Sequence, residues 1–260
     1  MTASITSTRN ERVQAVRRLH RRSARLAERR FVVEGPQAVR EALGSLLELY
    51  TSDLSDPLAV AAAARGVEVV HVDDKVLNAL AETVTPQGLV GVAALLEGTL
   101  PDRPRLVAVL HEVSDPGNAG TVIRTADAAG ADAVVLTEGS VDPHNGKCVR
   151  ATAGSLWHLP VVTEADPLEL VATLQARGLR VLATSGSGDI GLDDLDLTGP
   201  TAWVFGTEAH GLPDAVLQAA DARVRIPLYG RAESLNLATA AAVCLYASAR
   251  TQRGGSTVTG

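Results

Sequence analysis

Arg124 and Asn118 are the first residues whose types suggest chemistry. They lie in residues 115–136, where the turn Asp-Pro-Gly-Asn ends one apolar run and leads into a predicted helix. Asn118 is a good N-cap for that helix, and the small side chains around Arg124 indicate tight packing. An arginine in such a helix needs a partner or a purpose. Arg124 is therefore either a functional cation or a solvated helix side chain.

A loop with two glycines and one carboxylate follows the apolar run 202–205. Gly206 and Gly211 bracket Glu208 there, and glycine lets the backbone approach a ligand closely. His210 lies in the same loop, where a solvated histidine is the simpler interpretation. This loop is a candidate ligand-binding turn at the end of a strand.

A third segment, residues 225–247, ends a strand at Ile226-Pro227 and then begins a helix of small residues. Ser234 stands where its hydroxyl can cap this helix. Asn236, two residues later, is not needed as a cap, which leaves its side chain available for another role.

Gly186, Gly188 and Gly191 form a literal GxGxxG after an apolar run, the spacing of a dinucleotide-binding turn. That turn needs a helix at the third glycine, so that the helix N-terminus faces the pyrophosphate. Here LDDLDLTGP follows, with carboxylates that repel phosphate and a Gly-Pro break. An NAD-dependent oxidoreductase is therefore disfavoured, and the glycines indicate a loop at the carboxyl edge of a sheet.

The elements that must position these loops alternate along the chain, which is typical of α/β folds with parallel sheets covered on both faces. Strands are predicted at residues 31–35, 46–52, 67–72, 89–95, 106–113, 133–137, 159–162, 179–184, 202–206 and 223–228. Helices are predicted from Pro36 and at residues 58–65, 73–80, 119–129, 167–177, 213–220 and 235–250. Residues 97–105, with two prolines and four charged residues, predict a linker between two domains.

The charge of the chain is unevenly distributed. The 260 residues carry a formal charge of −6, with 46% hydrophobic and 3% aromatic residues. Residues 1–40 hold ten arginines and three glutamates, a net +7 that leaves −13 on the rest. The composition excludes a disordered or collagen-like chain, and no apolar run reaches the ~18–20 residues of a membrane helix. A basic end on an acidic body indicates a localised anionic partner.

Two distant cysteines, Cys148 and Cys244, predict neither a disulfide framework nor a zinc site. The N-terminus lacks the apolar core of a secretory signal, although an Arg-rich start is also a feature of mitochondrial transit peptides. Its apolar residues recur with helical spacing and lead directly into FVVEG, so we interpret it as part of the fold. A cytoplasmic protein is expected.

Three motifs in order make the chain resemble the SpoU (TrmH-like) family of RNA ribose 2′-O-methyltransferases, within the SPOUT superfamily. They are NAGTVIRTA (118–126), VFGTEAHGL (204–212) and IPLYGRAESLNLATAAA (226–242), with VDPHNGKCVRATAGSLWHLPV (141–161) between them. The start, ITSTRNERVQAVRRL followed by RRFVVEGPQAVREAL, resembles a substrate-binding domain like ribosomal protein L30e. The sequence departs from the family pattern at Thr152, where a serine is expected. The loop residues His144-Asn145-Gly146 are also unusual for the family.

The resemblance implies a fold, a division of the chain and a cofactor. It implies an N-terminal L30e-like α/β domain over residues 1–98, a linker at 99–105, and a parallel-sheet domain with a deep trefoil knot over 106–260. Members work as homodimers and bind S-adenosylmethionine among three knot loops. Carried over, the cofactor-binding residues are Thr184, Gly186, Gly206, Thr207, Gly211, Ile226, Leu228 and Leu235.

The resemblance also implies a reaction in which a ribose 2′-hydroxyl attacks the sulfonium methyl. The catalytic residues carried over are Arg124, Glu208, Asn236, Asn118 and Ser234. A guanidinium stays protonated in proteins and is a poor base, so Arg124 is expected to bind a phosphate and polarise the hydroxyl, supported by Asn118.

Structured RNA is the expected partner, with 23S rRNA favoured over tRNA because of the L30e-like domain. Phosphate contacts are expected from Arg9, Arg17, Arg18, Arg21, Arg22 and Arg150. Scarce aromatics disfavour a stacking platform for single strands. The alternatives are a tRNA methyltransferase and a non-catalytic RNA-binding protein of the same fold. A role in antibiotic resistance and a housekeeping role are both compatible with the sequence.

Overall fold

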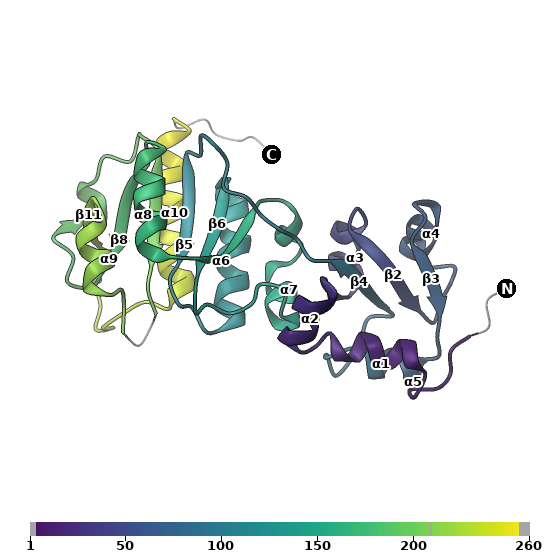
Figure 1. Ribbon diagram of the computed structural model, residues 1–260. Coiled ribbons are helices and arrows are strands. Elements are labelled where there is room, and N and C mark those ends of the chain that lie inside the picture. Colours follow the sequence, from purple (N-terminus) through teal and green to yellow (C-terminus); the bar gives the residue numbers. More distant parts are fainter. Residues whose placement is uncertain (1–3, 208–209, 255–260) are drawn as a thin grey trace. The chain divides into compact units, whose positions relative to one another are not determined.

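The computed structural model describes residues 4–207 and 210–254, which form two compact units (Figure 1). The first unit contains the residues up to 96 together with residues 144–157, and the second contains the remainder. Within the described ranges, no helix is long and apolar enough to cross a membrane.

The first unit is built on a four-stranded sheet of order β1-β4-β2-β3. Its strands are β1 (Arg30–Glu34), β2 (Leu46–Thr51), β3 (Glu68–His71) and β4 (Leu89–Ala94). β2 and β3 are parallel, but β4 runs antiparallel to both β1 and β2. The prediction of a parallel sheet is therefore wrong for this unit. A strand buried on both faces shows the same continuous apolar run in either direction, so composition alone does not reveal its direction.

Helices cover this sheet with apolar side chains. They are α1 (Glu11–Arg18), α2 (Arg22–Glu28), α3 (Pro36–Ala42), α4 (Pro57–Ala64) and α5 (Asp74–Leu80). α5 is capped by Asp73, whose carboxylate accepts a hydrogen bond from the backbone N–H of Val76. Val13 and Val16 of α1 pack with Leu77 of α5 and with strand valines in one core cluster. The basic N-terminus is thus an integral part of the fold.

Residues 144–157 pack with the first unit, although they follow strands of the second in sequence. They form α7 (Gly146–Thr152) and a 3-10 turn (Ser155–Trp157). The His144 ring lies 4.7 Å from the Phe31 ring, and Trp157 Nε1 donates to Ser45 Oγ at 3.0 Å. The division into functional domains at residues 99–105 stays a prediction, and it did not include this packing.

The second unit is an all-parallel, seven-stranded sheet of order β7-β6-β5-β10-β8-β11-β9. Its strands are β5 (Leu106–Leu110), β6 (Ala133–Thr137), β7 (Val161–Ala165), β8 (Arg180–Thr184), β9 (Ile190–Gly191), β10 (Thr201–Phe205) and β11 (Ala222–Arg225). The predicted parallel α/β class is confirmed here. The strand order does not itself establish a trefoil knot, which stays a prediction.

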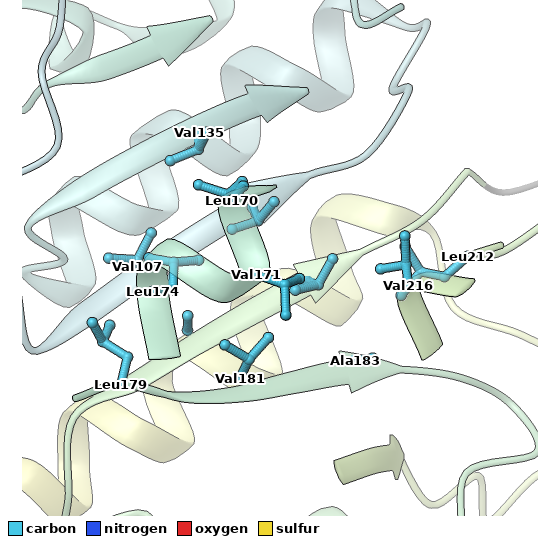
Figure 2. Packing of buried hydrophobic residues seen from close by; sticks show 13 residues of the cluster. Val107, Val135, Leu170, Val171, Leu174, Leu179, Val181, Ala183, Leu212 and Val216 are labelled. Atoms are coloured by element: carbon cyan, nitrogen blue, oxygen red, sulfur yellow. The ribbon is translucent and has the colours of Figure 1, made fainter. Parts of the chain in front are cut away.

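Helices lie on both faces of this sheet (Figure 1). α8 (Pro167–Ala176) and α9 (Asp214–Ala219) pack together on one face, whereas α6 (Pro116–Ala129) and α10 (Leu237–Gln252) pack together on the other. Figure 2 shows the core under α8, where Leu170, Val171 and Leu174 meet strand valines. On the opposite face, Trp203 of β10 is fully buried, and its Nε1 donates to Ser248 Oγ of α10 at 2.8 Å. This packing holds the carboxyl ends of β8, β10 and β11 side by side.

Candidate functional site

The loops after β8, β10 and β11 line one cavity of about 740 Å³. All eight residues predicted to bind a cofactor line it, together with Ser234 and Asn236. The eight are Thr184, Gly186, Gly206, Thr207, Gly211, Ile226, Leu228 and Leu235. The second unit therefore gathers at one edge of its sheet residues that are distant in sequence.

Hydrogen bonds and one close backbone approach hold the loop after β8 against its neighbours. Thr184 Oγ1 donates to Val204 O at 3.0 Å, and Ser185 N donates to Val224 O at 2.9 Å. Gly188 lies so close to β11 that a Cβ there would be 2.6 Å from Arg225 N. After Gly191 comes only a 3-10 turn (Leu192–Asp194), which confirms the prediction that no helix begins at the third glycine.

The loop after β10 is closed on itself by two backbone hydrogen bonds. Thr207 N donates to Gly211 O at 3.1 Å, and Gly211 N donates to Thr207 O at 2.9 Å. A Cβ on Gly206 would collide with the backbone of Gly211 and lie 2.6 Å from Leu212 N. Gly211 itself has a φ of +68°, which favours glycine. The predicted catalytic residue Glu208 lies outside the described residues.

Asn236, and not Ser234, caps α10. The Asn236 carboxamide oxygen accepts hydrogen bonds from Ala238 N at 2.9 Å and from Thr239 N at 3.3 Å. The prediction that Ser234 is the cap was therefore wrong, and so was the inference that Asn236 is not needed for capping. The helix begins at Leu237, two residues later than predicted, because both residue types are good caps and sequence alone did not choose between them. Ser234 instead lines the cavity.

A second correction concerns the start of α6. Its N-cap is Asp115, whose carboxylate accepts a hydrogen bond from Asn118 N at 2.8 Å, so the predicted Asn118 cap was wrong. Asn118 lies in the first turn, where its side-chain oxygen accepts a hydrogen bond from Asn236 Nδ2 at 3.1 Å. This bond joins α6 to the N-terminus of α10 beside the cavity.

Arg124 is exposed on α6 and does not line the cavity. Its side chain makes no hydrogen bond or ion pair with another residue in the part of the chain that the structure describes. The structure thus places an available guanidinium on the helix whose first turn contacts the cavity-lining Asn236.

The cavity wall is acidic. Asp214 and Glu233 line it, and the described lining residues include no lysine or arginine. Sequence reasoning did not select either carboxylate, although Glu233 lies within the quoted motif RAESLN. Asp214 is the second residue of the predicted helix 213–220, and its place in the wall depends on how α9 packs. Such a wall favours a positively charged ligand over a phosphorylated one.

The arginines of the first unit differ in availability. Side chains of the predicted RNA-binding set that lie on the surface are Arg9, Arg17, Arg18, Arg21 and Arg22. Arg25 is buried and donates to Leu19 O and His20 O. Arg150 lies 3.5 Å from both Glu34 and Glu82. The charge of Arg150 is therefore largely compensated, whereas the helices α1 and α2 carry the exposed positive charge.

Arg12 also has a structural role. It forms ion pairs with Glu48 at 3.0 Å and Glu68 at 2.5 Å. The hydrogen bond with Glu68 raises the pKa of Arg12 above its ordinary value, and the same bond lowers the pKa of Glu68. Arg12 consequently fixes α1 to the sheet.

Comparisons with known proteins agree with this geometry. The model of the SpoU rRNA methylase family matches residues 105–246, and that of the MRM3-like substrate binding domain matches residues 10–91. The chain is 36% identical to 23S rRNA (guanosine(2553)-2'-O)-methyltransferase RlmP of Bacillus subtilis, over 93% of this chain and 97% of that protein.

Two solved structures are similar over nearly the whole chain. The AdoMet-bound rRNA methyltransferase from Sinorhizobium meliloti has a TM-score of 0.86 at 34% identity, covering 95% of this chain and 97% of that one. The SpoU methyltransferase AviRb from Streptomyces viridochromogenes, in complex with AdoMet, has a TM-score of 0.86 at 29% identity, covering 95% and 100%. Sequence, domain order and fold together establish that the chain belongs to the SpoU rRNA methylase family.

Proposed function

We propose that this protein transfers a methyl group from S-adenosylmethionine to a ribose 2′-hydroxyl of structured RNA, with 23S rRNA as the substrate class. The observation that carries the proposal is the convergence of three loops, remote in sequence, on one acidic cavity. Relatives whose names specify 23S rRNA methylation support rRNA rather than the tRNA alternative.

The cavity has the chemistry that this cofactor needs. Gly206 and Gly211 bring backbone to its wall, and Ile226 and Leu235 supply apolar surface suited to an adenine ring. The wall carboxylates complement a cationic donor. When bound, S-adenosylmethionine supplies an electrophilic methyl group on a sulfonium.

The residues of the chain then have to place and activate the attacking hydroxyl. We assign Arg124 to the phosphate beside the target ribose and to polarising the 2′-hydroxyl, because its guanidinium is exposed and forms no ion pair with any of the described residues. A guanidinium stays protonated in proteins, so it does not accept the proton. Asn118 and Asn236, through their hydrogen bond, position the Arg124 helix against the cavity. Ser234 and Glu208 are assigned to shaping the site.

Exposed arginines on α1 and α2, and just before each of these helices, are proposed to bind the RNA by contacts with its phosphates. Arg9, Arg17, Arg18, Arg21 and Arg22 remain in this assignment. The contribution of Arg150 is expected to be smaller, because Glu34 and Glu82 already oppose its charge.

We also propose that the protein works as a homodimer in the cytoplasm. Large apolar side chains on the exposed face of α10 support a protein contact there: Val243 is 39% exposed and Tyr246 is 45% exposed. Sedimentation of the purified chain tests this assignment, and a monomer at working concentration would contradict it.

The experiment that tests the function mixes the full chain with labelled methyl donor and total rRNA, and then maps the methylated nucleotide. We expect incorporation at one ribose that resists alkaline cleavage. Matched reactions with tRNA test the alternative substrate. Cofactor binding without incorporation into any RNA would instead support a non-catalytic RNA-binding protein.

A further inference from the structure

A second hollow lies next to the cofactor cavity. It measures about 430 Å³ and is lined by Tyr229, Gly230 and Ala232 and, on α10, by Val243, which also belongs to the proposed dimer contact. Ile226, Leu228 and Leu235 line both hollows, so one stretch of chain forms their common wall. Any molecule seated in the second hollow is therefore a close neighbour of the cofactor.

Tyr229 lines the second hollow, and Arg231 stands between the lining residues Gly230 and Ala232 without lining it. The Tyr229 side chain is 90% exposed, and its hydroxyl donates to Asp193 Oδ2 at 3.4 Å. Arg231 is exposed and makes no ion pair or hydrogen bond with any residue of the ranges 4–207 and 210–254. An aromatic ring and an unpaired guanidinium thus lie two residues apart beside a largely apolar hollow.

We propose that this second hollow receives a nucleobase of the RNA substrate, with Tyr229 stacking on the base and Arg231 pairing with an adjacent phosphate. The inference rests on the proposed function, because a 2′-hydroxyl that attacks the methyl group must enter the cofactor cavity. The base and phosphates of that nucleotide, or of its neighbour, then lie just outside it. Aromatic rings and arginines are the side chains that bind unstacked bases and phosphates.

The scarcity of aromatic residues fits a contact with one base rather than a platform for many. Tyr229 lies on the surface of the cavity-lining loop, where a bulky ring has little packing to gain from its own chain. The lining of the hollow is largely apolar, which suits a flat base. The hydrogen bond from the Tyr229 hydroxyl to Asp193 orients the tyrosine ring beside it. A second copy of the chain is the competing occupant, which the experiment below separates.

Four variants of the full chain test the proposal against an rRNA fragment that the wild type binds. Tyr229→Ala is expected to raise the KM for RNA about tenfold, the effect of losing one base–aromatic stack, with an unchanged Kd for S-adenosylmethionine. Tyr229→Phe keeps the ring and should retain most of the affinity. Arg231→Ala should weaken RNA binding and reduce its salt dependence by about one ion. Arg103→Ala, an exposed arginine away from both hollows, is the matched control.

Direct RNA binding, measured by fluorescence anisotropy, keeps this test separate from catalysis. If the wild type binds RNA and cofactor but transfers no methyl group, the proposed function fails, while the anisotropy of the variants still tests the hollow. Unchanged RNA affinity in both Tyr229→Ala and Arg231→Ala would overturn the proposal. A Tyr229→Ala variant that dissociates into monomers with unaltered RNA affinity would also overturn it and assign the ring to a second copy.

Discussion

The side-chain amide of Asn236 donates a hydrogen bond to the Asn118 side-chain oxygen across 3.1 Å, joining residues 118 positions apart. Asn236 at the same time caps α10 and lines the proposed cofactor cavity. A single carboxamide thus links a helix start, the helix that carries Arg124, and the proposed donor site. Its oxygen serves the cap and its nitrogen serves the link, so the two roles can be separated by mutation.

Asn236→Ala is expected to reduce both stability and cofactor affinity. Loss of the cap should cost about 1 kcal/mol of unfolding free energy. Asn236→Asp keeps a carboxylate acceptor for Ala238 N and Thr239 N but removes the donor to Asn118. We expect this variant to unfold near the wild-type temperature yet bind S-adenosylmethionine more weakly in calorimetry. Equal cofactor affinity in Asn236→Asp would show that the link is dispensable.

Arg124→Ala is expected to abolish methyl transfer while leaving cofactor binding nearly intact. The reason is that the guanidinium lies outside the cavity lining and faces solvent. Calorimetry with S-adenosylmethionine and incorporation of labelled methyl into rRNA separate the two effects. Arg124→Lys retains the positive charge but lacks the planar guanidinium that can donate two hydrogen bonds to one phosphate. It should therefore be little more active than Arg124→Ala. Wild-type turnover by Arg124→Ala would remove this residue from the mechanism.

Gly206→Ala is expected to destabilise the second unit and weaken cofactor binding. A Cβ there would collide with backbone atoms of Gly211 and Leu212. Unlike the end of a flexible side chain, these atoms cannot easily move aside. Overpacking of this kind costs typically about 1–3 kcal/mol, measured by urea unfolding. Gly199→Ala is the matched control, because nothing lies within 4 Å of a Cβ at that position. Similar unfolding midpoints for the two variants would contradict the predicted collision.

The stability of the first unit should depend on pH through His20. Burial alone would lower the pKa of His20, but its bond with Glu82 at 3.2 Å outweighs burial and raises it above 6.5. The same bond lowers the pKa of Glu82, which stays charged near neutrality. Because the pKa of His20 is higher in the folded than in the unfolded chain, protonation stabilises the folded state. This stabilisation is fully present below the unfolded pKa of 6.5. It is lost as the pH rises through the pKa of the folded state.

The measurement compares the melting temperatures of wild type and His20→Gln from about pH 5.5 to about pH 8.5. We expect the largest difference at the acidic end and a shrinking difference toward the alkaline end. His71→Gln serves as a control, because His71 has a backbone partner, Ser52 O, and no ion pair to a carboxylate within the described chain. A constant difference between wild type and His20→Gln at every pH would contradict the role of the ion pair.

RNA binding should fall steeply with salt, and α1 should account for part of that dependence. Replacing Arg17 and Arg18 by alanine is expected to weaken binding uniformly across RNA sequences and to reduce the salt slope by about two. Arg65→Ala, at the exposed end of α4, is the control. Anisotropy titrations at several salt concentrations provide the slope. A slope equal to that of the wild type would exclude these two arginines from phosphate contact.

Much of the candidate site was predictable because its signals are local. Gly206 and Gly211, for example, mark a tight loop through residue type and spacing alone, and strand β6 has the bounds that its apolar run predicts. The family resemblance supplied eight predicted cofactor-binding positions, and the structure brings all eight to one cavity. Caps were harder, since Asp115 and Asn118, or Ser234 and Asn236, are nearly equivalent as local capping residues.

The sequence by itself determined the α/β class, the alternation of strands and helices apart from α7 and β9, the turns that line the cavity and the basic character of the N-terminal helices. These depend on periodicity and on residue preferences that act over a few positions. Only the tertiary structure decided that β4 runs antiparallel, that residues 144–157 pack with the first unit, and that Asn236 meets Asn118. Such outcomes depend on which distant surfaces bury each other, and apolar runs of similar composition do not specify their partners.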